Sequence, residues 1–370
     1  MLKYIFYFVL LFCFLSCKKN TVNPELLLGD WEFVTPKTIY ENDSLLSTTY
    51  VSSDFRFEKD SIFKLNDGFF QRGEKNNEYK YLGQKSKYYV ENDSLFILNT
   101  ITNDYLAQKI SHLSKDTLAL YDKDDKMTFY YTKRKAEIPS KINLSQITLS
   151  LGPCFGTCPI SSISVDNNGN VVYFGESNTQ YNGLFKGKIN KEIFEEIVSE
   201  LNNIRFTELK NEYSVDVSDL SDISVTFINN KKIIKTIYAY GHTEPRQLKS
   251  ILNRIKYLYQ DMNLKEIEYE FPILNPVFDN YHFQNSEVFY LQSLLLNSTK
   301  TEIQFRPKYR QTASLILPEE FDYENYEQMK RNVITNGRYF KLEDKYHQFS
   351  TFDIGFDFFK NNQSFSSNSE

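Results

Sequence analysis

Two cysteines separated by three residues form the most chemically suggestive pair in this sequence. Cys154 and Cys158 lie in GPCFGTCP, residues 152–159, where two glycines and two prolines exclude regular secondary structure. In an exported protein, an isolated pair of cysteines is more often a disulfide than two free thiols. We therefore expect a disulfide. The alternatives are a metal or redox pair, with His242 as a third ligand to Cu(I), and an unpaired structural role.

Other metal and nucleophile motifs are missing from the sequence. The four histidines lack the His-x-x-x-His or His-Glu-x-x-His spacing that places two zinc ligands on one helix face. The chain has no Gly-x-Ser-x-Gly elbow and no glycine-rich phosphate loop. We therefore predict no catalytic residue and no cofactor, and lean away from an enzyme. A hydrolase whose carboxylates meet only in the folded chain stays open.

Two groups of aspartates bear on metal binding. Asp122, Asp124 and Asp125 lack the twelve-residue spacing and closing glutamate of a calcium loop, so we interpret them as a solvated turn. A second group falls between an expected helix and an expected strand, and a metal site is the lesser interpretation there. It comprises Asp216, Asp219 and Asp222.

The first twenty residues, MLKYIFYFVLLFCFLSCKKN, have the pattern of an export signal. Lys3 supplies a positive charge, and the residues from Tyr4 to Leu15 are all apolar. Twelve helical residues reach about 18 Å, whereas the hydrocarbon core of a bilayer is about 30 Å thick. This length is typical of a secretory signal and is too short for a spanning helix.

The end of that stretch, Ser16 followed by Cys17, resembles the lipobox of bacterial lipoproteins. The resemblance implies that residues 1–16 are a signal peptide, that Cys17 carries lipid, and that residues 17–25 are a tether. It also implies a location in the cell envelope, at the outer membrane, with the lipid as the link to that membrane. A plain signal peptide or a short anchor is the alternative.

The composition favours a β-rich α+β protein. The chain of 370 residues contains 31 phenylalanines and 27 tyrosines, and aromatic residues are enriched in pleated sheets. The net charge of −5 at pH 7 does not indicate the excess of basic residues that is typical of nucleic-acid-binding proteins. Beyond the leader, no run of about 18 apolar residues occurs, so we expect no further membrane segment.

Residues 26–135 are predicted to form an antiparallel β meander or barrel. A polar pair followed by Ser or Thr and an apolar residue recurs at 41–45, 58–62, 91–95 and 114–118. Asn and Asp in such phrases favour tight turns, and the flanking segments alternate as strands do. Several hairpins in series are the expected result.

The start of this region, Gly29 and Trp31, resembles the opening of the lipocalin-like domains of bacterial lipoproteins. The resemblance implies a barrel in which the tryptophan closes one end and a small apolar ligand occupies the interior. The alternative is that Trp31 is a core aromatic and that the barrel is filled by its own side chains.

Residues 142–265 are predicted to form an antiparallel sheet with two helices on one face. Ile147, Leu149 and Leu151 alternate with polar residues, and apolar residues recur at helical spacing over 193–204 and 248–262. The order of strands, helix, strands and helix is satisfied most simply by that arrangement.

The GPCFGTCP motif followed by a strand–turn–strand resembles a family of exported bacterial proteins with a domain of unknown function. The resemblance implies a fold and boundaries for residues 142–265 and no activity. The spacing of Cys154, Cys158 and Pro159 also resembles the copper motif of thioredoxin-like copper chaperones, where the motif opens a helix. Here residues 160–166 alternate with period two and predict a strand, which argues against that fold.

The rest of the chain is less distinctive. Residues 267–360 are predicted to be a C-terminal α+β region, either a third domain or an extension of the second sheet, and residues 361–370 a disordered tail. The predicted function is that of a non-catalytic envelope lipoprotein that binds a small apolar ligand or an envelope protein. The alternative is a thiol redox or copper-handling protein that works through Cys154 and Cys158.

Overall fold

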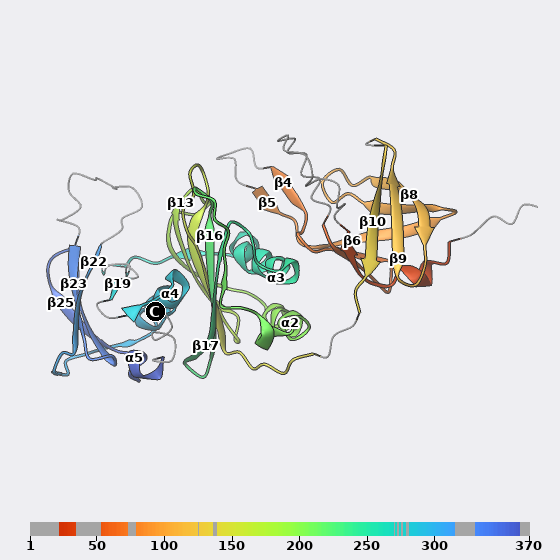
Figure 1. The fold of residues 1–370 in the computed structure, drawn as a ribbon. Helices are drawn as coiled ribbons and strands as arrows, with labels where there is room; N and C mark the ends of the chain where they lie inside the picture. Colours follow the sequence, from red (N-terminus) through yellow and green to blue (C-terminus); the bar gives the residue numbers. More distant parts are fainter. Residues whose placement is uncertain are drawn as a thin grey trace, which may run out of the picture. The chain divides into compact units, whose positions relative to one another are not determined.

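The computed structural model describes residues 22–34, 53–72, 79–124, 126–135, 139–269, 271, 274, 277–278, 281–314 and 330–362. The chain divides into two compact units, Met1–Gln71 with Leu82–Ala136 and Arg72–Tyr81 with Glu137–Glu370 (Figure 1). The predicted signal peptide, Cys17 and the first part of the tether lie outside the described residues, as do residues 363–370.

The first unit is a closed antiparallel barrel, which confirms the fold expected from the repeated turns. Its strands follow one another in the order β1-β10-β9-β8-β7-β6-β3-β2, and a helical turn, η1 (Pro24–Leu27), precedes them. The barrel strands are β1 (Gly29–Phe33), β2 (Phe55–Glu58), β3 (Ile62–Leu65), β6 (Lys85–Glu91), β7 (Ser94–Leu98), β8 (Tyr105–Leu113), β9 (Thr117–Asp122) and β10 (Met127–Lys133).

The repeated polar phrases form hairpin turns of this barrel. The phrase at 58–62 joins β2 to β3 with Asp60 at φ 60°, and the phrase at 91–95 joins β6 to β7 with Asn92 at φ 57°. Asp and Asn tolerate this left-handed conformation because their short polar side chains hydrogen-bond locally. The phrase at 114–118 joins β8 to β9, whereas the phrase at 41–45 lies outside the described residues.

Side chains of the barrel strands pack together in one buried cluster. Trp31 is fully buried, and its indole Nε1 donates a hydrogen bond to the Leu27 carbonyl at 2.6 Å. The rings of Phe55 and Tyr131 lie across from each other with centroids 4.6 Å apart. Trp31 is therefore a core aromatic. The buried cluster consists of Leu27, Trp31, Phe55, Phe57, Phe63, Tyr88, Leu95, Ile110, Leu118, Leu120 and Tyr131.

The second unit is built on an eight-stranded sheet in the order β15-β17-β16-β11-β12-β13-β14-β18. Its strands are β11 (Gln146–Leu151), β12 (Ile160–Asp166), β13 (Asn170–Ser177), β14 (Gly183–Lys188), β15 (Glu212–Tyr213), β16 (Asp222–Asn229), β17 (Lys232–Tyr240) and β18 (Lys265–Glu266). The connecting helices are α2 (Lys191–Asn202), η3 (Phe206–Glu208), α3 (Arg246–Lys256) and η4 (Leu258–Asp261).

Helices α2 and α3 cover one face of this sheet, as predicted. Ile147, Leu149 and Leu151 of β11 share one buried cluster with Phe194 and Ile197 of α2. The apolar stripe of α3 belongs to the same cluster and consists of Leu248, Ile251, Leu252 and Ile255. Burial of such stripes against a sheet is the main force that fixes both helices.

A third helix, α4 (Asn285–Leu296), covers the opposite face, which the sequence did not predict. It packs on β11, β12 and β16, and Figure 1 shows it on the side of the sheet away from α2 and α3. All of the residues from Ser286 to Ser293 are buried. Eight consecutive residues exceed two helical turns, so α4 is enclosed on all sides.

The remaining elements complete the other side of α4. A five-stranded sheet has the order β21-β25-β24-β23-β22, and its residues Val333, Phe340 and Leu342 pack in one cluster with Tyr290 of α4 and Ile233 of β17. The elements are β19 (Val277–Phe278), β20 (Tyr281–His282), β21 (Thr299–Thr301), β22 (Tyr309–Ser314), β23 (Lys330–Thr335), β24 (Tyr339–Glu343), β25 (Phe349–Asp353) and α5 (Phe358–Asn361). The C-terminal region therefore shares a core with the eight-stranded sheet.

The face of the sheet under α4 is lined by hydroxyl groups. Thr148 lies opposite Ser164 and Thr226 in the register, and Ser150 lies opposite Ser162 and Ser224. These side chains are small and satisfy one another: the Thr148 and Ser164 hydroxyls are 3.0 Å apart, and the Thr226 hydroxyl is 2.8 Å from that of Ser286 on α4. The layer is polar, and its hydroxyl groups pack against one another and form hydrogen bonds.

Glu287 of α4 is the charged member of this layer. It is 3% exposed, and its carboxylate accepts hydrogen bonds from the Thr236 hydroxyl at 2.7 Å and from the Gln284 backbone N–H at 2.8 Å. Burial raises the pKa of the Glu287 carboxyl, and the two hydrogen bonds oppose this effect. Glu287 thus accepts a hydrogen bond from the backbone at the start of α4, where Gln284 itself is exposed.

The short segment Arg72–Tyr81 belongs to the second unit, although barrel residues flank it in the sequence. Strand β4 (Phe70–Arg72) pairs with β5 (Tyr79–Tyr81). The Tyr81 ring stacks on Tyr257 with centroids 5.3 Å apart. The Gln260 side chain accepts from the Tyr81 N–H at 2.9 Å and donates to the Tyr79 carbonyl at 3.1 Å.

In the part of the chain that the structure describes, no helix combines the length and the apolar character needed to cross a bilayer.

Replacing Glu287 by Gln tests the buried carboxyl. Because its folded-state pKa is raised, the folded protein holds this proton more tightly than the unfolded chain. Wild-type stability therefore falls as the pH rises through that pKa. The Glu287→Gln variant has no carboxyl group at this position and therefore lacks this dependence. Between about pH 4 and pH 7, the unfolding free energy of the wild type should fall relative to that of Glu287→Gln. Urea unfolding followed by circular dichroism measures it, and Trp31 fluorescence reports the barrel separately.

The matched control is Glu192→Gln on the exposed side of α2. It should leave the pH profile of unfolding unchanged, because its carboxylate is solvated in both states. A wild-type protein that gains stability over Glu287→Gln as the pH rises would contradict the assignment.

Candidate functional site

The loop that carries the two cysteines lies at one end of the eight-stranded sheet. β11 ends at Leu151 and β12 begins at Ile160, while β16 begins at Asp222 and β17 ends at Tyr240. These strands are antiparallel neighbours. The connections 152–159, 214–221 and 241–245 therefore lie at the same end.

Cys154 and Cys158 form the predicted disulfide, with Cα atoms 5.7 Å apart. The bond closes a loop of about five residues, and the chain-entropy model assigns about 2 kcal/mol to such a closure. Both cysteines are half-buried. Because the sulfurs are bonded to each other, neither is a thiolate ligand in this state.

Backbone hydrogen bonds fix the loop further. The Phe155 N–H donates to the Asp219 carbonyl at 3.2 Å, and the Gly152 N–H donates to the Asp222 carbonyl at 3.0 Å. The loop is therefore held both covalently and by the neighbouring 214–221 connection. Phe155 nevertheless points outward: it is 88% exposed, the highest value for a large hydrophobic side chain among the described residues.

A pocket of about 120 Å³ lies beside the loop, on the side of the sheet that carries α3. We call it the carboxylate pocket. Its lining residues are Leu151, Gly152, Cys158, Pro159, Ser221, Asp222, Ile223, His242, Glu244, Leu252, Asn253 and Lys256.

Two carboxylates line this pocket, Glu244, which is buried, and Asp222, which is partly buried. Glu244 is 7% exposed, and its Oε2 atom has no hydrogen-bond partner. Burial raises the pKa of the Asp222 carboxyl, and a hydrogen bond from its own backbone opposes this. The loop lies directly against Asp222, since a Cβ atom on Gly152 would be 1.8 Å from its Oδ1. Only glycine allows this approach.

His242 enters the same pocket from a tight turn after β17. Gly241 has φ 71° and His242 has φ 59°, a region that favours glycine. Burial lowers the pKa of the imidazole; Glu244 opposes this, and Lys249 and Lys256 add to it. The imidazole is therefore neutral at pH 7.

Ser221 and His242 are of the types that serve as nucleophile and base, and the Ser221 Oγ lies 3.3 Å from the His242 Nε2. A working triad also needs a carboxylate hydrogen-bonded to the other ring nitrogen. Among the described residues, no carboxylate makes that hydrogen bond.

The comparison with protein families concerns this part of the chain. Residues 145–259, from the start of β11 to η4, match one family model. The region is a domain of unknown function, DUF6438. The loop and every residue of the carboxylate pocket lie within it. No curated protein matches the chain, and no solved structure does.

A second pocket, of about 280 Å³, flanks the same loop of the DUF6438 region on the α4 side. Leu151 and Gly152 line both pockets. Its polar lining includes the Ser150 and Ser162 hydroxyls and Glu176, whose carboxyl pKa is raised by burial. The loop thus separates two small recesses at one sheet end.

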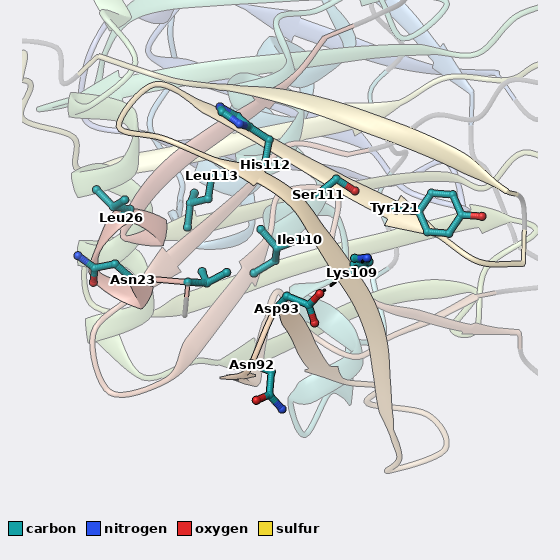
Figure 2. Close-up of a pocket in the computed structure, with 11 residues that line it drawn as sticks. Asn23, Leu26, Asn92, Asp93, Lys109, Ile110, Ser111, His112, Leu113 and Tyr121 are labelled. Atoms are coloured by element: carbon teal, nitrogen blue, oxygen red, sulfur yellow. Dashed lines mark ion pairs between the residues drawn. The ribbon is translucent and has the colours of Figure 1, made fainter. Parts of the chain in front are cut away.

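The barrel carries a wider groove of about 1060 Å³ (Figure 2). It lies between the segment before β1 and strand β8, where the register with β9 shifts between Ile110 and His112. Asp93 and Lys109 form an ion pair across it at 3.8 Å, and both side chains are more than half exposed. Exposed pairs of this kind contribute little to stability. No orphaned polar atom lines this groove among the described residues, so the carboxylate pocket is the better candidate.

The members of the two acidic groups lie in different surroundings. Asp222 lines the carboxylate pocket, whereas Asp216 and Asp219 are exposed. In the first group, the Asp124 N–H donates to the Asp122 carboxylate at 2.8 Å as in a polar turn, and Asp125 lies outside the described residues. Within the ranges the structure describes, no three His, Cys, Asp or Glu residues converge to hold a metal ion.

Sequence reasoning singled out Cys158, Asp222 and His242, which line the carboxylate pocket, and missed Glu244. Glu244 precedes Pro245 and was passed over as part of a helix start. No local pattern marks it, because its burial arises from α3 folding back over the sheet.

Gly152→Ala tests the close approach between the loop and Asp222. The added methyl group would overlap the Asp222 carboxylate, and overpacking of this kind costs about 1–3 kcal/mol of unfolding free energy. Urea unfolding of the DUF6438 region, followed by circular dichroism, should show the loss. In an Asp222→Ala background the same change should cost clearly less. Equal losses in both backgrounds would contradict the contact.

Proposed function

We propose that this protein is a non-catalytic binding protein of the cell envelope, tethered by lipid on Cys17 to the outer membrane. The observation that carries the binding role is the exposure of Phe155 on a disulfide-closed loop. In this proposal the N-terminal barrel is the lipocalin-like domain and serves as a spacer. The end of the DUF6438 sheet contacts an envelope protein.

The physical reason lies in preorganisation. Aromatic residues dominate the energetic centres of protein interfaces, and ordering a flexible loop on binding is unfavourable. Here the disulfide and the hydrogen bond from the Phe155 N–H to Asp219 order the loop beforehand. An exposed aromatic ring on a rigid support is what a protein partner can bury at low entropic cost.

The tether is supported by the leader pattern and by the chemistry of anchoring. One acyl chain holds a protein to a bilayer weakly, whereas two or more hold it stably. Lipoprotein processing attaches several acyl groups at the mature N-terminal cysteine, here Cys17.

Cys17→Ser tests the tether. The variant should keep residues 1–16 and lose the added mass of the acyl groups, so intact mass spectrometry should give the mass of the unprocessed chain. Cys13→Ser, inside the apolar stretch, is the matched control and should be processed as wild type. A Cys17→Ser variant that is processed like the wild type would reject lipidation.

Phe155 is tested with a photo-crosslinking phenylalanine analogue at its position in living cells. We expect one discrete adduct, and none from the same analogue at Tyr346, which is 63% exposed. With the captured partner purified, Phe155→Ala should weaken binding by about 2 kcal/mol, roughly thirtyfold in Kd. No adduct, or unchanged affinity, would refute the interface.

A thiol redox role is the second candidate, because Cys158 shares a pocket with His242 and Asp222. Measurements of partner binding and of activity toward partner thiols separate the two roles. Removal of both cysteines by Cys154→Ser and Cys158→Ser should only weaken partner binding if the loop is an interface. It should abolish all activity toward partner thiols if the loop exchanges disulfides, and Phe155→Ala should then have little effect.

A further inference from the structure

Three aromatic side chains form a contiguous cluster on the outer side of the barrel. Tyr89 of β6, Phe96 of β7 and Tyr105 of β8 lie on neighbouring strands. The Tyr89 ring stacks on Phe96 with centroids 4.6 Å apart and meets the Tyr105 ring edge-on at 4.9 Å. Both tyrosines are exposed, to 40% and 43%. Exposed rings in mutual contact are typical of an interaction surface, and we call this one the aromatic face.

The orientation of the rings narrows what the aromatic face can contact. The Tyr89 and Phe96 planes are 4° apart, and neighbouring strands lie about 4.8 Å apart. Rings that stack across two strands at this spacing stand upright on the sheet. A nucleic-acid base stacks on an open ring face, whereas upright tyrosines present ring edges and hydroxyl tips. Rings with an apolar body and a polar tip are enriched at membrane–water interfaces.

Lysines flank the aromatic face. Exposed and buried residues alternate along β6, so the exposed Lys85 and Lys87 point to the same outer side as Tyr89. Ammonium groups close to an anionic bilayer are attracted to its headgroups. Aromatic rings beside lysines are therefore the composition expected of a surface that lies against such a bilayer.

The expected tether leads to the same part of the barrel. Cys17 is six residues before Asn23, which caps η1, so the chain between them spans at most about 22 Å. Asn23 lines a groove together with Asn92 and Lys109 (Figure 2). Along β8, Lys109 is four residues from Tyr105, or about 13 Å. A lipid on Cys17 would thus hold a bilayer within reach of the aromatic face.

The end of the barrel next to Asn23 is less suited to an anionic surface. The hairpin turns at this end are those between β2 and β3, β6 and β7, and β8 and β9. They carry more acidic than basic residues, and anionic headgroups repel carboxylates. The acidic residues are Glu58, Asp60, Glu91, Asp93 and Asp116, and the basic ones are Lys59 and Lys115.

We propose that the aromatic face lies against an anionic lipid bilayer, with the barrel on its side. The Tyr89 and Tyr105 rings enter the headgroup region, and Lys85 and Lys87 contact anionic headgroups. The tether in this argument rests on the function proposed above, whereas the affinity of the face for lipid does not. A short tether keeps the local concentration of the face high, so a weak intrinsic affinity is sufficient.

The first experiment uses the chain from Lys18 to Glu370, which lacks the leader and the lipid and retains every described residue. It should float with vesicles of equal parts phosphatidylcholine and phosphatidylglycerol. Tyr89→Ser combined with Tyr105→Ser should weaken this binding about tenfold. The matched control is Tyr130→Ser, which is 54% exposed on β10, three strands from β7. No vesicle binding, or an equal loss in the control, would overturn the proposal.

A second pair of variants tests the lysines. Lys85→Gln combined with Lys87→Gln should weaken binding to the mixed vesicles about thirtyfold at low salt. Binding to pure phosphatidylcholine vesicles should not change. Trp31 is fully buried in the barrel, so its fluorescence shows whether each variant is folded. Unchanged affinity of both double variants for the mixed vesicles would overturn the proposal.

A third experiment tests direct contact with lipid. Tyr105→Trp should be quenched by brominated phosphatidylcholine in the mixed vesicles, and Tyr130→Trp should not. Vesicle binding by a chain whose Cys17→Ser variant is processed like the wild type would reject only the tether. Lipidation without vesicle binding would reject only this inference. A dimer that Tyr89→Ser dissociates, without vesicle binding, would assign the face to a second copy of the chain and overturn the proposal.

Discussion

The complete enclosure of helix α4 is the constraint on which the second unit depends. The helix lies between the eight-stranded sheet and the five-stranded sheet (Figure 1), so a polar group on its buried residues can find a partner only inside the protein. Ser286, Glu287 and Ser293 meet this demand through hydroxyl and amide groups of the facing strands. The strands in turn must present Ser and Thr where a conventional core would present Val and Leu.

This arrangement decides where the protein can bind something. One face of the eight-stranded sheet is covered by α2 and α3 and the other by α4. The connections after β11 and β17 and before β16 converge at one accessible end of the sheet. Backbone of Gly152 is pressed against Asp222 there, so the disulfide loop and the carboxylate pocket form one rigid structure.

The sequence predicted those parts of the fold that local patterns determine. Asn92 and Asp60 marked barrel turns, Ile147, Leu149 and Leu151 marked a strand, and the two amphipathic helices were found. Helix α4 was only partly foreseen, because a helix apolar on all sides has no stripe to orient it. The polar residues that alternate with Ile147, Leu149 and Leu151 gave no sign of the helix that covers them, since alternation cannot distinguish water from a polar helix. The isolation of Glu244 in the pocket depends on long-range packing and has no sequence signal.

The chain passes between the two units three times. It enters the second unit at Arg72, returns to the first after Tyr81, and crosses again after Ala136. A single protease nick near residues 136–138 would cut only one of these three connections. The severed part would stay associated through the Tyr81–Tyr257 stack and the Gln260 hydrogen bonds. This path therefore keeps the two parts of a cut chain together. A fragment that starts at residue 137 would also lack the strand that covers Tyr257.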